Sequence, residues 1–202
     1  MNVRIDELAE VAQALARRTS LDDQLQHLVE RTAVLLGVER VGVRLLDPTR
    51  GRLIAVARAG APLHRAPFAD FGIGEGLMGW VVQQQKPLTT GDAEADPRFV
   101  PREGMLERLG SFVAVPLMVH NACIGVLYAS HTQTAQFGAD HEQLLTLLAG
   151  LCAPHIESAR LTRLSEIDAL TGALNRRGAT SLLDEKAPLS VVMCDLDWFK
   201  RI

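Results

Sequence analysis

The sequence predicts an α+β domain, because the spacing of its apolar residues changes from helical to strand-like and back again along the chain. Two helical stripes come first, from Leu8 to Leu15 and from Leu25 to Leu36. Runs that alternate in polarity follow, and a leucine-rich stripe beginning at Leu144 predicts a last long helix. With 202 residues, 48% of them hydrophobic, the chain is long enough to bury a core.

The second helix and the first strands have clear boundaries in the sequence. Ser20, with Asp23 three residues later, forms a capping-box pattern, and Gly37 provides a stop signal. The residues from Val41 to Leu46 alternate in polarity, which predicts a half-buried strand, and a second strand follows from Leu53 to Arg58.

The middle of the chain contains a glycine-rich segment from Phe71 to Gly76, which leads into a predicted helix. Its glycine spacing differs from that of a dinucleotide-binding loop, so we do not expect one. Asp96 before Pro97 predicts another helix start. Strands over 111–119 and 123–130 form a predicted hairpin around His120-Asn121, in which Asn121 would accept a left-handed conformation.

Composition and charge exclude several classes of protein. A net charge of -3 without a Lys/Arg-rich run argues against nucleic acid and against an anionic membrane surface as partners. No apolar stretch is long enough for membrane insertion, and Met1 to Ser20 lacks a signal-peptide pattern, so we expect a cytoplasmic protein. Cys123, Cys152 and Cys194 occur singly, which predicts buried structural thiols, with a redox sensor as the alternative.

Carboxylates follow a short apolar run near the end of the chain. Residues 189–193 predict a buried strand, and Asp195 and Asp197 stand where it would end. Such carboxylates can hold Mg²⁺, and Lys200 could face a phosphate. The alternative is that two solvated aspartates simply end an ordinary strand.

An upstream segment, Asp168-Ala-Leu-Thr-Gly-Ala-Leu-Asn-Arg-Arg-Gly178, adds to this pattern. Together the two segments resemble the start of a GGDEF domain, the diguanylate cyclase family, which converts two GTP into cyclic di-GMP with Mg²⁺. The resemblance implies that Asp195 is a metal ligand and that Trp198, Phe199 and Lys200 lie at the phosphates. It gives the first segment, with its Asp168, Asn175 and Arg176, a structural role.

A complete domain of that family is expected to have about 150 residues. Only residues 168–202 match it here, without the GG(D/E)EF motif or the guanine-reading residues. We therefore expect this part to be incomplete and catalytically inactive.

The rest of the chain resembles a GAF domain, a sensory fold related to PAS. The resemblance is carried by Gly72-x-Gly74-x-Gly76, Pro87-Leu-Thr-Thr-Gly-Asp92, Asp96-Pro-Arg-Phe99, Ser111-x-x-Ala-Val-Pro-Leu117, Ile124-Gly-Val-Leu127 and Phe137-x-x-Asp140. It implies a central antiparallel sheet with flanking helices and a pocket beneath residues 73–108. The expected order is a GAF domain over 1–160, a linker-helix end over 161–167 and the incomplete GGDEF segment over 168–202.

The sequence departs from the better-defined ligand groups of that family. Ser130-His131 and Asp140-His141 stand where cyclic-nucleotide-binding relatives carry other residues, and no cysteine has the neighbouring histidine typical of bilin attachment. For an unidentified small-molecule ligand we predict Trp80, Phe99 and Tyr128 as anchors and Asp92 as a polar contact. The alternative is that these aromatic residues only fill the core.

The helix from Asp140 to Glu166 is expected to transmit regulation. Leu144, Leu148 and Leu151 predict a homodimer along this helix, and Pro154 predicts a kink or a break in it. The sequence thus favours a ligand-sensing GAF module of a diguanylate cyclase. One alternative is a GAF-fold enzyme such as a free methionine-sulfoxide reductase, which would need reactive thiols near the pocket, and another is a stand-alone small-molecule-binding dimerisation module.

Overall fold

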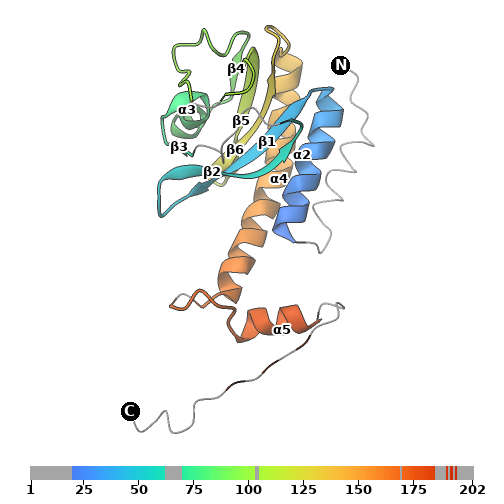
Figure 1. Cartoon of the computed structure of the whole chain (residues 1–202), viewed down its shortest axis with the longest axis vertical. Helices are drawn as coiled ribbons and strands as arrows, with labels where there is room; N and C mark the ends of the chain where they lie inside the picture. Colours follow the sequence, from blue (N-terminus) through green and yellow to red (C-terminus); the bar gives the residue numbers. More distant parts are fainter. Residues whose placement is uncertain are drawn as a thin grey trace. The chain divides into compact units, whose positions relative to one another are not determined.

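A six-stranded antiparallel sheet forms the centre of the first part of the chain (Figure 1). The computed structural model describes residues 20–61, 70–102, 105–168, 170–184, 190, 192 and 194, and the chain divides into two compact units, Met1–Ala159 and Arg160–Ile202. The strands are β1 (Arg40–Asp47), β2 (Arg52–Ala59), β3 (Phe71–Gly72), β4 (Leu88–Thr90), β5 (Ser111–Val119) and β6 (Ala122–His131). Their order across the sheet is β3-β2-β1-β6-β5-β4, so β1 and β6 lie at its centre.

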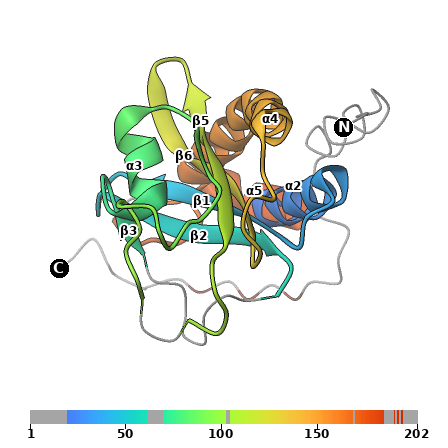
Figure 2. The ribbon, with the colours of Figure 1, turned by 90° about the horizontal axis from the view of Figure 1, so that it is seen from above.

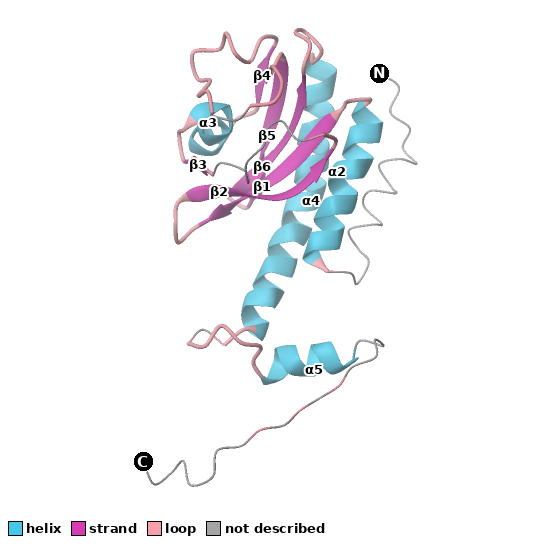
Figure 3. Ribbon diagram, viewed as in Figure 1, coloured by secondary structure: helices cyan, strands magenta, loops and turns pink. Residues whose placement is uncertain are grey.

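Helices cover both faces of this sheet. Helices α2 (Leu21–Leu36) and α4 (Ala139–Glu166) pack on one face, and α3 (Gly76–Gln84) lies on the other (Figures 2 and 3). Each face has its own apolar cluster, with Val43 and Leu145 among the residues of the first and Val81 and Phe112 among those of the second. The predicted α+β fold with a central antiparallel sheet is therefore confirmed.

The predicted boundaries of α2 are confirmed by its caps. The Ser20 hydroxyl accepts a hydrogen bond from the Asp23 backbone N–H at 3.1 Å and donates to the Asp23 carboxylate at 2.7 Å. Gly37 ends the helix with a left-handed φ of 63°. The helical stripe predicted from Leu8 to Leu15 lies outside the described residues.

Two local expectations in the middle of the chain are wrong. Asp96 starts no helix, because its carboxylate instead accepts hydrogen bonds from the backbone N–H and the guanidinium of Arg98, and the surrounding residues form turns. In the β5–β6 hairpin the left-handed residue is His120, with φ of 54°, rather than Asn121.

Helix α4 is continuous through Pro154, so the predicted break is absent. The leucine stripe is divided differently from the prediction: Leu148 is fully buried, and Leu144 is buried beside it in the core of its own domain. The exposed side chains are Leu147, 59% accessible, and Leu151, 46% accessible. Leu144 and Leu148 thus belong to the domain core and are not available for a partner.

The second unit contains α5 (Arg176–Asp184) and the turn before it. The Asp168 carboxylate accepts hydrogen bonds from the Thr171 hydroxyl and from the backbone N–H groups of Thr171 and Leu170, which lowers the pKa of Asp168. The Asn175 side chain accepts from the N–H groups of Arg177 and Gly178 and so caps α5.

The predicted metal and phosphate residues Asp195, Trp198, Phe199 and Lys200 lie outside the described residues. Ser190 and Val192, the described part of the predicted strand over 189–193, are not in a strand. A single strand has no neighbour with which to pair its backbone groups. In the described part of the chain, no helix is long and apolar enough to cross a membrane.

Candidate functional site

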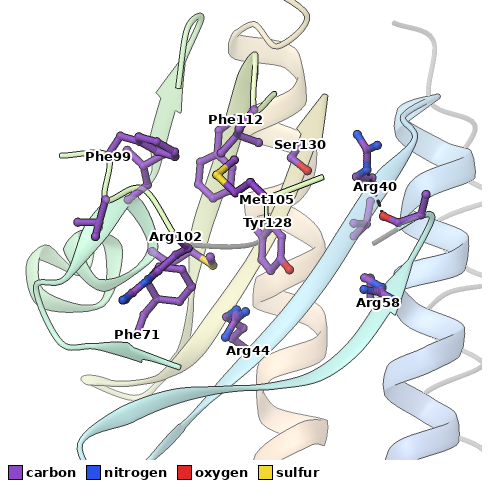
Figure 4. A pocket seen from close by; sticks show the side chains of 17 residues that line it. Arg40, Arg44, Arg58, Phe71, Phe99, Arg102, Met105, Phe112, Tyr128 and Ser130 are labelled. Atoms are coloured by element: carbon purple, nitrogen blue, oxygen red, sulfur yellow. Dashed lines mark hydrogen bonds between the residues drawn. The ribbon is translucent and has the colours of Figure 1, made fainter. Parts of the chain in front are cut away.

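A cavity of about 80 Å³ lies between the sheet and the segment that runs from α3 to β5 (Figure 4). One buried water needs about 10–15 Å³, so the cavity has room for more than a single water molecule. Its walls come from strands β1, β2, β3, β5 and β6, from α3, and from the loop before β5. This position agrees with the pocket expected beneath residues 73–108.

The alternation of β1 places charged side chains on the cavity face of the sheet. Val43 packs in the core beneath α2 and α4, whereas Arg40, Gly42 and Arg44 occupy the alternate positions of the strand. Across the ladder Gly42 is opposite Arg58 of β2 and opposite Tyr128 of β6, which places these residues on the same face.

Two of these arginines are almost completely buried. Arg40 is 6% accessible, donates a 3.1 Å hydrogen bond from Nε to the Ala61 carbonyl oxygen, and forms ion pairs with Glu39 and Glu107. Arg44 is 3% accessible and donates a 3.2 Å hydrogen bond to the carbonyl oxygen of Leu53. Buried cations require such partners, and here the partners also fix where the guanidinium groups lie.

Phe71 forms part of the apolar wall and contacts two guanidinium groups. Those of Arg44 and Arg102 lie 4.9 and 4.8 Å from its ring centroid. Arg102 also pairs with Glu75, whose pKa is lowered, chiefly by the hydrogen bond that its carboxylate accepts from the Gly72 N–H. The short strand β3 and the start of α3 are thereby linked to the loop that carries Arg102.

Aromatic rings from the neighbouring strands β5 and β6 complete the wall. Phe112 and Tyr128 stack with their centroids 5.7 Å apart. The Tyr128 ring lies directly over Gly42, since a Cβ atom built on that glycine would be 2.4 Å from the phenol oxygen. The absent side chain at position 42 therefore makes the space that the ring occupies.

Ser130 contributes a polar atom to the same cavity. Its side chain is fully buried, and its Oγ has no hydrogen-bond partner among the described residues. It is opposite Arg40 in the β1–β6 ladder. Buried hydroxyl groups usually have a partner, so this one indicates a place where a bound molecule could supply it.

The structure places the four predicted pocket residues in two groups. Phe99 and Tyr128 line the cavity, whereas Trp80 and Asp92 do not. Trp80 packs under the guanidinium of Arg98, 4.6 Å from its ring, and Asp92 pairs with Arg108 at 2.7 Å. Contact of any of these residues with a ligand stays a prediction.

Sequence reasoning missed the arginines. The strand from Val41 to Leu46 was expected to be half-buried, with the face of Gly42 and Arg44 in water. The structure buries that face too, beneath α3 and the following loop. The sequence feature that could have indicated these arginines is the spacing of Arg40 and Arg44, which places both on one face of the strand. A strand face in contact with water has the same spacing, so the feature does not predict burial.

Neither cysteine of the first unit, Cys123 or Cys152, lines the cavity. Cys152 belongs to the core beneath α2 and α4, and burial raises its pKa to about 12. Burial also raises the pKa of Cys123. Cys194, in the second unit, is exposed, so the prediction of a buried thiol is wrong at this position. Among the described residues no group of three or more His, Cys, Asp or Glu side chains could hold a metal ion.

Solved structures with similar folds come from several classes of protein. The GAF domain from an Acinetobacter phosphoenolpyruvate-protein phosphotransferase matches with a TM-score of 0.69 and 25% identity, over 80% of this chain and 98% of that one. The free methionine-R-sulfoxide reductase from Neisseria meningitidis matches with a TM-score of 0.67 and 24% identity, over 77% of this chain and 89% of that one. The similarity to the reductase shows a shared fold and nothing about activity.

Curated relatives are longer proteins. A Nif-specific regulatory protein of Herbaspirillum seropedicae is 26% identical over 157 residues, which cover 75% of this chain and 29% of the relative. A Nif-specific regulatory protein of Azospirillum lipoferum is 26% identical over 201 residues, which cover 96% of this chain and 31% of the relative. The chain therefore spans about a third of the length of these relatives. Residues 18–157 match the GAF domain family, which is more than half of the sequence, and the chain accordingly belongs to that family.

Proposed function

We propose that the first unit is a ligand-sensing regulatory module that binds a small molecule in the cavity between the sheet and α3. The observation that carries this proposal is the combination of apolar walls with a few buried polar groups, Arg40, Arg44 and Ser130, in one cavity. Small-molecule sites commonly have this composition. The regulatory role is supported by the names of the Nif-specific relatives.

A thermal-shift screen of small metabolites tests this proposal. A compound that binds only the folded chain stabilises it by about 2.7 kcal/mol at a hundred times its Kd. Phe99→Ala should weaken binding of the compounds that the screen identifies, because the Phe99 ring lines the cavity. Trp80→Ala is the matched control and should not weaken binding, because Trp80 is partly buried in the same cluster but does not line the cavity. If no compound in the screen stabilises the chain, or if the two variants weaken binding equally, the proposal of a sensor site in this cavity is wrong.

The finer proposal is that the module regulates a diguanylate cyclase that uses GTP and Mg²⁺. It is supported by the motif over residues 168–178 and by the hydrogen bonds of Asp168 and Asn175, which suit the structural role that the motif implies. The 202 residues contain no GG(D/E)EF motif, so this chain should make no cyclic di-GMP. Product formed from GTP and Mg²⁺, and lost in Asp195→Ala, would contradict that expectation.

One observation favours a second proposal for the protein that this module regulates, namely a Nif-specific regulator instead of a diguanylate cyclase. The Azospirillum lipoferum relative aligns over 96% of this chain, so most of the segment after residue 168 is included. The coding sequence beyond Ile202 distinguishes the two: a GG(D/E)EF motif there would support the cyclase, and its absence would favour the regulator.

A reductase of the free methionine-sulfoxide class is the enzymatic alternative. It would need reactive thiols at the pocket, and no cysteine is among the described residues that line the cavity. We therefore expect no turnover of oxidised methionine with a thiol donor. Turnover that depends on Cys123 would favour the enzyme.

We also propose that the chain forms a homodimer through the exposed face of α4. Leu147 and Leu151 are one helical turn apart and accessible, and a leucine left in water forgoes roughly 1.5–3 kcal/mol of burial. Leu147→Glu with Leu151→Glu should halve the mass measured by light scattering, and Thr146→Glu, an exposed control in the same helix, should not. A monomeric unaltered chain at high protein concentration would refute the dimer.

A further inference from the structure

The lining of the cavity has an uneven charge. Four arginines line it, Arg40, Arg44, Arg58 and Arg102, and none of the lining residues in the described part of the chain is acidic. We propose that the cavity binds a small organic anion, with its carboxylate or phosphate group at the arginines and its apolar body against the aromatic wall. This inference rests on the proposed function, since it names the chemical class of the ligand for the same site.

The arginines are arranged around one space and come from three segments. Arg40 and Arg44 belong to β1, Arg58 faces the same side from β2, and Arg102 comes from the loop before β5 (Figure 4). Arg44 and Arg102 both lie within contact distance of the Phe71 ring. Cations held close together in a site partly closed to water repel one another more strongly than in bulk water, and an anion among them relieves that repulsion.

The carboxylates that pair with these arginines do not line the cavity. Arg40 pairs with Glu39 and Glu107, and Arg102 pairs with Glu75. A guanidinium has five N–H donors in a planar fork, and Arg40 uses three of its donors in its hydrogen bonds to Ala61, Glu39 and Glu107. The protein carboxylates can therefore fix the guanidinium while further N–H groups bind a ligand oxyanion.

Ser130 provides an independent indication of a ligand. Its Oγ is fully buried, lines the cavity and has no partner among the described residues. It lies opposite Arg40 in the ladder and shares its face of β6 with Tyr128. An oxyanion bound by the arginine could accept a hydrogen bond from this hydroxyl as well.

The apolar wall argues for an organic rather than an inorganic anion. Phe71, Phe99, Met105, Phe112 and Tyr128 all line the same cavity as the arginines. Inorganic phosphate would fill the charged side only, and the ligand would not contact these apolar side chains. An anion with a flat apolar body would bury surface against them, and burial of apolar surface favours binding.

Isothermal titration calorimetry on the full chain tests the inference with four probes: benzoate, phenyl phosphate, uncharged benzamide and inorganic phosphate. Benzoate or phenyl phosphate should bind about tenfold more tightly than benzamide, as expected for charge-assisted hydrogen bonds, and inorganic phosphate should bind weakly. The tighter of the two organic anions identifies the ligand class as a carboxylate or a phosphate.

Variants identify the residues responsible. Arg58→Gln should weaken the organic anions about tenfold with little effect on benzamide. Arg50→Gln is the matched control, because Arg50 is 70% accessible at the β1–β2 turn and does not line the cavity. Ser130→Ala removes a hydroxyl at nearly constant volume and should weaken the anions several-fold, which gives a second test if Arg58→Gln fails to fold.

Equal affinity for benzoate, phenyl phosphate and benzamide, or equal losses in Arg58→Gln and Arg50→Gln, would overturn the anion inference. The sensor proposal would then survive, because uncharged molecules still bind. If benzoate and phenyl phosphate do not bind at millimolar concentration while the thermal-shift screen finds other stabilising compounds, the anion inference is likewise wrong and the sensor proposal stands. If the screen also gives no compound, the sensor function fails together with the anion inference.

Discussion

Replacing Gly42 by alanine should destabilise the domain through a single clash. The new Cβ atom would lie 2.4 Å from the Tyr128 phenol oxygen and 2.5 Å from its Cζ. Because carbon atoms prefer separations of about 3.5–4.0 Å, the ring would have to move by about 1 Å. Tyr128 is stacked on Phe112, so this movement disturbs a second ring. Overpacking of this kind costs about 1–3 kcal/mol in the free energy of unfolding.

Urea unfolding of a double-mutant cycle measures the clash itself. In a Tyr128→Ala background the ring is gone, and Gly42→Ala should be neutral or should stabilise by about 0.5–1 kcal/mol through the lower chain entropy of alanine. Gly150→Ala is the control, because this glycine lies in α4 with open space where a Cβ atom would be added, and the change should stabilise by about 0.8–1 kcal/mol. An equal loss for Gly42→Ala with and without the Tyr128 ring would refute the reasoning.

Three further predictions use the same chain. Leu148→Ala should cost about 2–5 kcal/mol of unfolding free energy because its side chain is fully buried, whereas Val34→Ala, at a side chain that is 75% accessible, should stay within about 0.5 kcal/mol, and similar losses would contradict this assignment. The pKa of Asp96 is lowered, chiefly by its hydrogen bond with a neighbouring arginine, so the stability it contributes is present above its unfolded pKa of about 3.9 and is lost as the pH falls through its lower folded pKa. Thermal unfolding across the acid range should show a weaker pH dependence in Asp96→Asn. A thiol reagent should modify exposed Cys194 in the native chain and Cys152 only on unfolding, and equal modification rates would be the contrary result.

Short sequence patterns were sufficient to predict most of the helices and strands of the first unit. Ser20, Asp23 and Gly37 determine the ends of α2 by contacts within a few residues. The alternation from Val41 to Leu46 predicted β1, and the two apolar runs on either side of His120-Asn121 predicted β5 and β6 as a hairpin. The pattern at Asp96 was ambiguous. An aspartate before a proline can cap a helix or close a turn, and the arginine two residues later decided between the two.

The site depended on information that no local pattern contains. The alternation in β1 separates two faces, but it does not say that α3 and its following loop cover the face that carries Arg44. The leucines of α4 were ambiguous in the same way. Their spacing indicates a buried face, and only the packed structure distinguishes Leu148, inside the domain, from Leu147, available to a partner.

The position of β1 at the centre of the sheet has a consequence for how the domain folds. Residues 40–45 of β1 pair with residues 125–130 of β6, so strands distant in sequence must meet before the cavity exists. Pairing over such a distance requires a large loop to close first, and it is slow compared with forming a hairpin. During synthesis on the ribosome Arg40 and Arg44 would therefore remain in water until β6 has emerged. A nascent chain that stops before β6 can form the β1–β2 hairpin, but it lacks the strand that brings Ser130 opposite Arg40.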